Sequence, residues 1–248
     1  MVRTGFTTEQ LCTRWEAQRE IKNLMGKYSL SLLLEKKNEV FEDFWSADRE
    51  DVCLGLNNGW YVGRKSVQAY FNALYERTAL ETKLMVENFP DRLKMLPEKK
   101  LFGVGHFDNR PVSSPIIAVA DDGQTAKGMW TCAASVTDFT VSGPESDWVW
   151  GFYAVDFVLE NGNWKIWHMR FMEEIHAYCG STWTKERPQN PPREGFSALA
   201  DFHLPEPDVK AELYKPYAND RSEILLPRLP EAYATFSDTF TYGIEEVR

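Results

Sequence analysis

The sequence predicts an α+β protein in which three helices precede a long antiparallel sheet. Apolar residues recur at helical spacing over the first third of the chain, whereas β-branched and aromatic residues dominate the middle. Two tight-turn signals, Asp121-Asp122-Gly123 and Asn161-Gly162, interrupt the middle part, because these residue types tolerate positive φ. Helices packed on one face of such a curved sheet can leave a cone-shaped cavity between the two layers.

The helices and a short hairpin are expected in the first third. Thr7 is followed by Glu9 and Gln10, which is typical of a capped helix start. The apolar stripe that follows includes Tyr28, one turn after Leu24. The pattern predicts helices over residues 7–34, 38–45 and 64–88, and short strands over residues 52–56 and 60–62.

The sheet is expected from residue 101 to residue 176, after a loop or short helix that holds two prolines. Regular alternation in the last strand places Trp164, Ile166, His168 and Arg170 on one face. This face would carry an imidazole and a guanidinium group beside apolar side chains. The predicted strands are residues 101–107, 112–120, 125–141, 148–159 and 163–176.

Residues 181–248 are expected to form a proline-rich C-terminal arm beyond a domain of residues 1–180. Eight of the thirteen prolines lie in this tail, so regular helix or sheet cannot continue for long. Its many leucine, phenylalanine and tyrosine residues are too apolar for plain disorder. We expect the arm to wrap its own domain or a neighbouring subunit.

Composition narrows the classes of function. The formal net charge of −9 disfavours a nucleic-acid partner, which would need a basic face. No apolar run has the length of a membrane span, and the N-terminus has no signal-peptide pattern. The aromatic content of 14%, with nine tryptophans, is typical of cores, interfaces and pockets for flat apolar ligands.

The four cysteines are widely separated and form no CxxC pair, so we expect free thiols in a reducing, cytoplasmic compartment. No His or Cys residues fall at the usual zinc-ligand spacings, and no metal or other cofactor is expected. The GxSxG, P-loop, GxGxxG and HExxH motifs are also missing, which disfavours a hydrolase triad, a kinase or a nicotinamide enzyme.

Four stretches together resemble one family. They are EIKNLMGKY (residues 20–28), NGWYVG (58–63), AVADDGQTAKGMW (118–130) and WGFYAVDFVLENGNWKIWH (150–168). In order and spacing they resemble SnoaL-like proteins of the nuclear transport factor 2-like (NTF2-like) superfamily, over about residues 7–178. The resemblance implies a cone-shaped barrel with a pocket for a bulky, mostly apolar small molecule. Enzymes of this superfamily include cofactor-independent dehydratases, isomerases, cyclases and lyases, and other members only bind ligands.

Two types of member resemble this chain in style, the bile-acid 7α-dehydratases and the diarylpropane lyases. The dehydratase pocket uses a Tyr on the first helix, an Asp one turn on, a His, and an Arg from the last strand. By this resemblance Tyr28 matches the Tyr, His106 is similar in context to the His, and Arg170 resembles the Arg. Leu33 stands at the Asp position, which departs from the pattern. With the lyases the chain shares general build and aromatic richness.

General acid–base chemistry fits these residue types. A His can act as base near neutral pH, and an Arg or a Tyr hydroxyl group in a low-dielectric cavity can stabilise a developing oxyanion. The hypothesis is that His168 or His106 is the base, with Arg170 and Tyr28 on the substrate oxygen. Aromatic residues expected to line the substrate pocket are Trp60, Tyr61, Trp130, Trp148, Trp150 and Tyr153.

Structural roles compete with each of these functional ones. Tyr28 can be a core residue, His168 a buried His bonded to backbone, and His106 a turn residue. Arg170 can pair with Glu173 or Glu174 at the strand end. Two carboxylates in apolar strands must be exposed, paired with Arg or catalytic, because an unpaired buried charge is costly; they are Asp138 and Asp156. Two further His residues are expected to be structural or superficial, His176 and His203.

The sequence therefore predicts a cofactor-independent lyase that dehydrates, or cleaves a C–C bond of, a bulky hydroxylated aromatic or polycyclic compound. It is expected to form a homo-oligomer, a dimer or trimer, through the outer face of the sheet. An isomerase or cyclase in the same pocket is the first alternative. The second, a non-catalytic ligand-binding module, predicts that Tyr28, His106, His168 and Arg170 do not meet in one cavity.

Overall fold

The computed structural model describes residues 5–33, 40–97, 101–180, 182–184, 195–222 and 227–244. The helical elements are α1 (Thr8–Leu33), α2 (Val40–Phe44), α3 (Arg64–Asn88), α4 (Pro90–Leu93), α5 (Ser197–Ala200) and a 3-10 turn, η2 (Phe236–Asp238). The strands are β1 (Cys53–Leu56), β2 (Gly59–Val62), β3 (Asp108–Asn109), β4 (Val112–Val119), β5 (Thr125–Thr140), β6 (Gly143–Glu160), β7 (Asn163–Tyr178) and β8 (Val209–Lys210).

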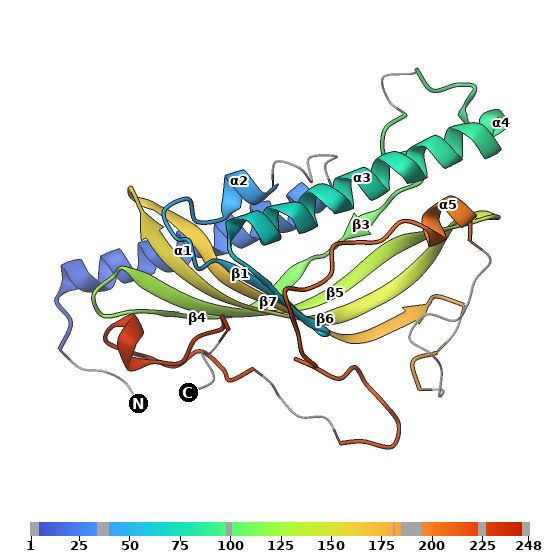
Figure 1. Cartoon of the computed structure of the whole chain (residues 1–248). Helices are drawn as coiled ribbons and strands as arrows, with labels where there is room; N and C mark the ends of the chain where they lie inside the picture. Colours follow the sequence, from blue (N-terminus) through green and yellow to red (C-terminus); the bar gives the residue numbers. More distant parts are fainter. Residues whose placement is uncertain are drawn as a thin grey trace.

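One strongly curved sheet forms the body of the molecule. Its strand order is β3-β5-β6-β7-β1-β2-β8, and β4 also pairs with β5. Neighbouring strands are antiparallel except β1 and β7. The helices α1, α2 and α3 lie on one side of the sheet (Figure 1). The C-terminal segment (described residues 195–222 and 227–244) begins at α5 beside α3 and then passes to the other side of the sheet. The predicted α+β cone is confirmed.

The predicted helices and most strands are confirmed to within a few residues, although Leu34 and residues 38–39 lie outside the described residues. The Asn161-Gly162 hairpin has φ values of 50° and 76°, as a tight turn between twisted strands requires. The strand predicted over residues 101–107 is wrong. Gly103 and Gly105 have φ values of 73° and 79°, so the chain turns there instead of extending.

Two β-bulges in β7 decide which of its side chains face the helices. Asp156 pairs with His168 while Phe157 pairs with Ile166, so Trp167 is the extra residue of the first bulge. Gly151 pairs with Glu173 while Trp150 pairs with Ile175, so Glu174 is the extra residue of the second. Each extra residue reverses the alternation of the residues that follow it. The prediction that Ile166, His168 and Arg170 share one face is therefore wrong.

Gly151 allows β6 and β7 to approach closely at the second bulge. A Cβ atom at this position would lie 2.1 Å from the carbonyl oxygen of Met172. We expect Gly151→Ala to lower the free energy of unfolding by about 1–3 kcal/mol, measured by urea denaturation, because backbone must move. Gly26→Ala is the control, since its Cβ would meet nothing within 4 Å and alanine is the better helix former. Equal stability of the two variants would contradict the register.

The C-terminal segment packs along the sheet of its own chain. Strand β8 pairs with β2, and the Leu213 N–H donates to the carbonyl of Asn57. Further on, Tyr233 and Tyr242 are buried against the outer face. A separate apolar cluster forms where this segment meets the sheet, and it comprises Met129, Phe152, Ala154, Met172, Tyr214 and Tyr242.

A buried ion pair lies between the outer face and this C-terminal segment. Lys127 Nζ donates to Asp156 Oδ1 at 2.6 Å, and both side chains are fully buried. Asp156 Oδ2 accepts the Tyr242 N–H at 2.7 Å and lies 2.9 Å from His168 Nδ1. Burial raises the pKa of Asp156, but His168 and Lys127 together lower it below its ordinary value. Four aromatic rings surround the ammonium group, those of Tyr233, Phe236, Phe240 and Tyr242.

Candidate active site

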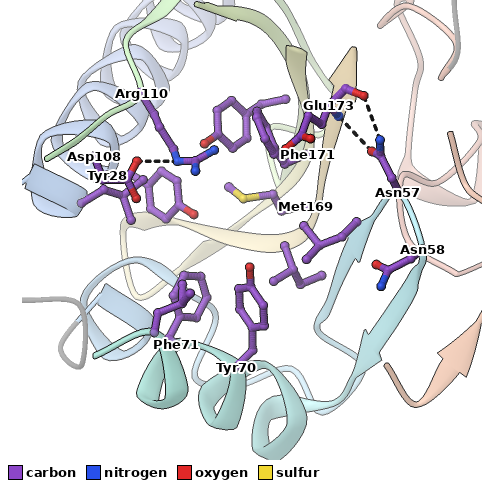
Figure 2. Close-up of a pocket in the computed structure, with 15 residues that line it drawn as sticks. Tyr28, Asn57, Asn58, Tyr70, Phe71, Asp108, Arg110, Met169, Phe171 and Glu173 are labelled. Carbon is purple, nitrogen blue, oxygen red and sulfur yellow. Dashed lines mark hydrogen bonds and ion pairs between the residues drawn. The ribbon is translucent and has the colours of Figure 1, made fainter. Parts of the chain in front are cut away.

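A cavity of about 430 Å³ lies between α1, α3 and the inner face of the sheet (Figure 2). This volume is in the range of pockets that enclose small organic ligands. Its wall is mostly aromatic and aliphatic, with a few polar groups from different elements. The lining residues are Tyr28, Leu32, Leu54, Leu56, Asn57, Asn58, Tyr70, Phe71, Leu74, Asp108, Arg110, Tyr153, Met169, Phe171 and Glu173.

Three tyrosines give the cavity both aromatic faces and hydroxyl groups. Tyr28 comes from α1, Tyr70 from α3 and Tyr153 from β6. Tyr28 and Tyr153 meet edge to face at 6.2 Å, and Tyr153 packs on Phe171 at 4.7 Å. Burial raises the pKa of all three, that of Tyr70 to about 12. At neutral pH these hydroxyl groups therefore keep their protons and can donate hydrogen bonds.

Arg110, the first residue after β3, places a positively charged side chain in the cavity. Arg110 Nε donates to Asp108 Oδ1 at 2.7 Å, and the Ser29 hydroxyl of α1 holds the Arg110 carbonyl at 2.6 Å. Figure 2 shows the guanidinium group pointing toward the middle of the cavity, near Met169. Burial lowers the pKa of Arg110, but Asp108 and nearby tyrosines more than offset this, and the pKa lies above its ordinary value. Arg110 is thus a fixed positive charge.

A smaller hollow of about 210 Å³ adjoins this cavity, and Leu74, Asp108 and Arg110 line both. In it His106 Nδ1 lies 3.1 Å from Glu81 Oε2. Burial raises the pKa of Glu81, but hydrogen bonding to His106 and the charge of Arg77 lower it below its ordinary value. An anionic Glu81 favours the tautomer with the proton on Nδ1, which makes Nε2 the proton-accepting nitrogen of the ring.

A second acid–base group lies on the sheet side of the same space. His176 Nδ1 lies 3.0 Å from Glu173 Oε1, and His176 Nε2 lies 3.3 Å from Asp147 Oδ2. Glu173 lines the larger cavity, whereas His176 and Asp147 line the smaller hollow. Burial lowers the pKa of His176, but the two carboxylates outweigh it and raise the pKa to about 9. Glu173, His176 and Asp147 therefore connect the larger cavity with the smaller hollow.

The structure brings together two of the four predicted catalytic residues. Tyr28 lines the larger cavity and His106 the smaller hollow. His168 and Arg170 line neither, because the bulge at Trp167 turns them to the outer face. There His168 binds Asp156, so it is a buried His bonded to a carboxylate instead of backbone. Their predicted placement in the cavity is corrected.

Arg170 contacts the C-terminal segment. Its Nε donates to the Tyr242 carbonyl at 2.8 Å and its Nη2 to the Gly243 carbonyl at 3.0 Å. Its guanidinium carbon lies 4.6 Å from the centre of the Trp60 ring. Trp60, a predicted pocket residue, is thus buried beneath Arg170 and does not line the cavity.

Of the other predicted pocket residues, only Tyr153 lines the cavity. Tyr61 packs behind the wall on Tyr70 and donates its hydroxyl proton to the Pro205 carbonyl. Trp130 is buried against Phe157 in the main core. These aromatic residues form a layer behind the cavity wall. Residue type alone could not show whether an aromatic residue lies in the wall or behind it.

Trp148 and Trp150 also lie away from the cavity. Their rings meet edge to face at 6.2 Å, and Trp150 packs on Trp183 at 5.4 Å. Trp148 and Trp183 are 37% and 43% exposed. Their prediction as pocket residues is corrected, because the alternation of β6 turns them away from the helices.

Several site residues were missed at the sequence level. For Asp108 and Arg110 a signal exists: with His106 they follow the i, i+2, i+4 spacing of one face of an extended segment. For Glu173 and His176 no such signal exists, because a spacing of three places them on opposite faces of a regular strand. The bulge at Glu174 brings them to one face, so His176 is part of the site although a structural or surface role was predicted.

The fold and its interior cavity define an α+β cone protein that encloses a small-molecule site. A family model described as "SnoaL-like domain" matches residues 13–170, more than half of the chain. The chain belongs to the SnoaL-like family, within the NTF2-like fold. A comparison with curated proteins finds no match.

Among solved structures, a provisionally named scytalone dehydratase from Novosphingobium aromaticivorans is 18% identical, with a TM-score of 0.47 and coverage of 73% of this chain and 96% of that one. The LinA-type3 hexachlorocyclohexane dehydrochlorinase of Novosphingobium barchaimii is 11% identical, with a TM-score of 0.47 and coverage of 71% and 99%. A protein of unknown function from Mycobacterium tuberculosis is 16% identical, with a TM-score of 0.44 and coverage of 66% and 76%.

Two negative findings apply to the described part of the chain. No helix there is both long and apolar enough to cross a bilayer. Within the same residues, no group of three or more His, Cys, Asp or Glu side chains could hold a metal ion.

Proposed function

We propose that this protein is a cofactor-independent lyase that acts on a bulky hydroxylated aromatic or polycyclic small molecule. One observation supports this most: the His106–Glu81 pair and the Arg110 cation lie in two adjoining hollows that share a wall. A base and an oxyanion-stabilising cation are what proton abstraction beside a carbonyl group requires.

In this mechanism the Nε2 atom of His106 removes a proton from the carbon next to a substrate carbonyl group. Arg110 and the Tyr28 hydroxyl group stabilise the enolate oxygen that develops, in a cavity whose low dielectric strengthens both interactions. A positioned general base contributes about two to four orders of magnitude in rate, and one oxyanion donor about two to three. Loss of a β-substituent then gives the conjugated product.

The walls favour an aromatic substrate without negative charge. Tyr28, Tyr70 and Tyr153 present ring faces and edges against which aryl groups can stack. Acidic lining residues outnumber Arg110 in the larger cavity, where Asp108 and Glu173 face the ligand space. An anionic ligand would be repelled there, whereas a neutral hydroxylated compound is accommodated.

Two other functions remain candidates. An isomerase or cyclase would use the same base and cation, and only the product separates it from a lyase. A non-catalytic binding module is favoured by the position of His168 and Arg170, which line neither the larger cavity of Tyr28 nor the adjoining hollow of His106.

Assembly into a dimer or trimer stays a prediction, as does a cytoplasmic location. The C-terminal segment already covers the outer face around Lys127 and Asp156. If copies associate through the outer face, the partly exposed Trp148 and Trp183 offer an apolar surface for that contact.

The test uses the aldol adduct of acetophenone and benzaldehyde, a β-hydroxy ketone whose dehydration gives the chromophore chalcone. We expect the purified protein to produce chalcone faster than buffer, without added metal or cofactor. Leu74 lines both hollows, so Leu74→Trp places a larger side chain in the space that a ligand would occupy, and it should abolish this activity. Leu30→Trp, at a 58% exposed position of α1, is the matched control and should retain it.

The proposal is wrong if the protein accelerates elimination neither of this compound nor of a panel of aryl β-hydroxy ketones that differ in ring substitution. It is also wrong if Leu74→Trp, folded by circular dichroism, is as active as the Leu30→Trp control.

A further inference from the structure

The two ring nitrogens of His176 both face carboxylates. Nδ1 lies 3.0 Å from Glu173 Oε1 and Nε2 lies 3.3 Å from Asp147 Oδ2. An ionised carboxylate has no proton to donate and therefore only accepts hydrogen bonds. Hydrogen bonds from His176 to two ionised carboxylates thus require a proton on each ring nitrogen. The geometry thus defines a protonated imidazole between two anions.

The surroundings hold this arrangement in place. Asp147 is almost fully buried, with a side chain 2% exposed, whereas the Glu173 side chain is 26% exposed and faces the larger cavity. Asn57 fixes the backbone of Glu173 from both sides: its Nδ2 donates to the Glu173 carbonyl at 2.8 Å, and its Oδ1 accepts the Glu173 N–H at 2.9 Å. Figure 2 shows this pair of bonds at the cavity wall. The unit therefore has a buried end and an end that a ligand can reach.

We propose that Asp147, His176 and Glu173 form the general acid of the reaction, and that the leaving group is a hydroxyl group that departs as water. Glu173 is the catalytic residue that contacts the leaving oxygen, and His176 and Asp147 are positioning residues that supply its proton. This inference rests on the proposed lyase function and narrows it to dehydration of a β-hydroxy carbonyl compound.

Two protons and two electron pairs move in this elimination. His106 takes the proton from the α-carbon, and the released electron pair forms the C=C bond. His176 Nδ1 passes its proton to the Glu173 carboxylate. The C–O bond breaks with its electron pair on oxygen, and this oxygen takes the proton from the Glu173 carboxyl group, which becomes a carboxylate again. Water leaves. His176 is now neutral and keeps its proton on Nε2, in a hydrogen bond to Asp147, and His106 is protonated. Exchange with solvent then returns both histidines to their starting states.

Two separate acid–base units explain why the site holds two histidines in different surroundings. His106 faces the carboxylate of Glu81 through Nδ1, whereas His176 faces a carboxylate through each ring nitrogen. The raised pKa of His176, about 9, supports a stored proton at neutral pH. The other charged or titratable groups of the smaller hollow are Arg77, Glu81, His106, Asp108, Arg110 and Asp138.

The first measurement needs no substrate. The imidazole of His176 is titrated by NMR in the wild-type protein and in Asp147→Asn and Glu173→Gln. We expect titration near pH 9 in the wild type and a fall of one unit or more in each variant, because each removes one anion. If Asp147→Asn does not fold, Glu173→Gln at the partly exposed position gives the same comparison. A wild-type titration near pH 6.5, the ordinary value, overturns the proposal and leaves the lyase function untouched.

The second measurement varies the leaving group. Chloride leaves without a proton, so the β-chloro analogue of the aldol adduct needs the base but no acid. We expect Glu173→Gln to slow dehydration of the alcohol by about a hundredfold or more and to change chloride elimination by only a few fold. His106→Gln should slow both reactions.

The outcomes separate the two proposals. Equal loss on alcohol and chloride in Glu173→Gln, or no loss on either, overturns the acid assignment while the lyase function stands. Failure of the wild-type protein to accelerate either elimination overturns the lyase function itself. Rescue of alcohol dehydration by Glu173→Asp, relative to Glu173→Gln, would support proton donation by a carboxyl group over a purely structural role.

Discussion

Replacing Asp156 with alanine should lower the free energy of unfolding by about 3–5 kcal/mol, measured by chemical denaturation. The substitution leaves the ammonium group of Lys127 without its carboxylate at a fully buried position. It also removes the acceptor of the Tyr242 N–H and the Thr241 hydroxyl group, which hold the C-terminal segment on the sheet. The loss should therefore include detachment of that segment, visible as faster proteolysis of residues 227–244.

Asp91→Ala is the matched control for this prediction. Asp91 also pairs with a lysine, Lys94, but its side chain is 84% exposed, and such pairs contribute about 0–1 kcal/mol. The double variant Lys127→Met/Asp156→Leu should recover much of the loss, because apolar residues of similar size can replace a buried ion pair. An Asp156→Ala loss as small as that of Asp91→Ala would show that the pair is not buried as described.

Replacing His106 with glutamine should lower kcat/KM for the β-hydroxy ketone by about two to four orders of magnitude. Glutamine keeps a hydrogen-bond donor toward Glu81 but cannot accept a proton, so substrate binding should change little and kcat should carry the loss. Glu81→Gln should have a smaller effect, because it disturbs the tautomer of His106 without removing the base. Steady-state kinetics on chalcone formation measures both.

Two histidines serve as controls in the same assay. His203→Gln changes an exposed residue and should leave both stability and rate unaltered. His168→Gln should lower stability, because His168 binds Asp156, but its kcat should stay within a few fold of the wild type. If His168→Gln loses activity and His106→Gln does not, the choice of base is reversed and the cavity cannot be the active site.

Local sequence patterns were sufficient for most of the fold. Helical periodicity predicted α1 and α3, and the Asn161-Gly162 turn predicted the β6–β7 hairpin, because both depend on neighbours within a few residues. The strand expected over residues 101–107 failed for a similarly local reason, since two glycines with positive φ make a turn of an apolar stretch.

The candidate site was predictable only in part. Tyr28 lies on the first helix, as the family resemblance implied, and lines the larger cavity. His106 lines the smaller hollow from a turn region before β3, where a strand was predicted. Arg110 lies four residues after His106, a spacing that places both on one face of an extended segment, so this pattern in the sequence could have indicated Arg110. Glu173 and His176 could not be paired from spacing, because a regular strand separates residues three apart onto opposite faces.

By itself, the sequence determined the α+β layout and the aromatic character of the interior, since these follow from periodicity, turn residues and composition. The resemblance of four sequence stretches indicated the family. Tertiary structure alone decided which polar groups face the cavity. Each bulge in β7 adds one residue against the neighbouring strand, and one added residue moves every later side chain to the opposite face. His168 and Arg170 consequently hold the C-terminal segment, while Glu173 and His176 reach the candidate site.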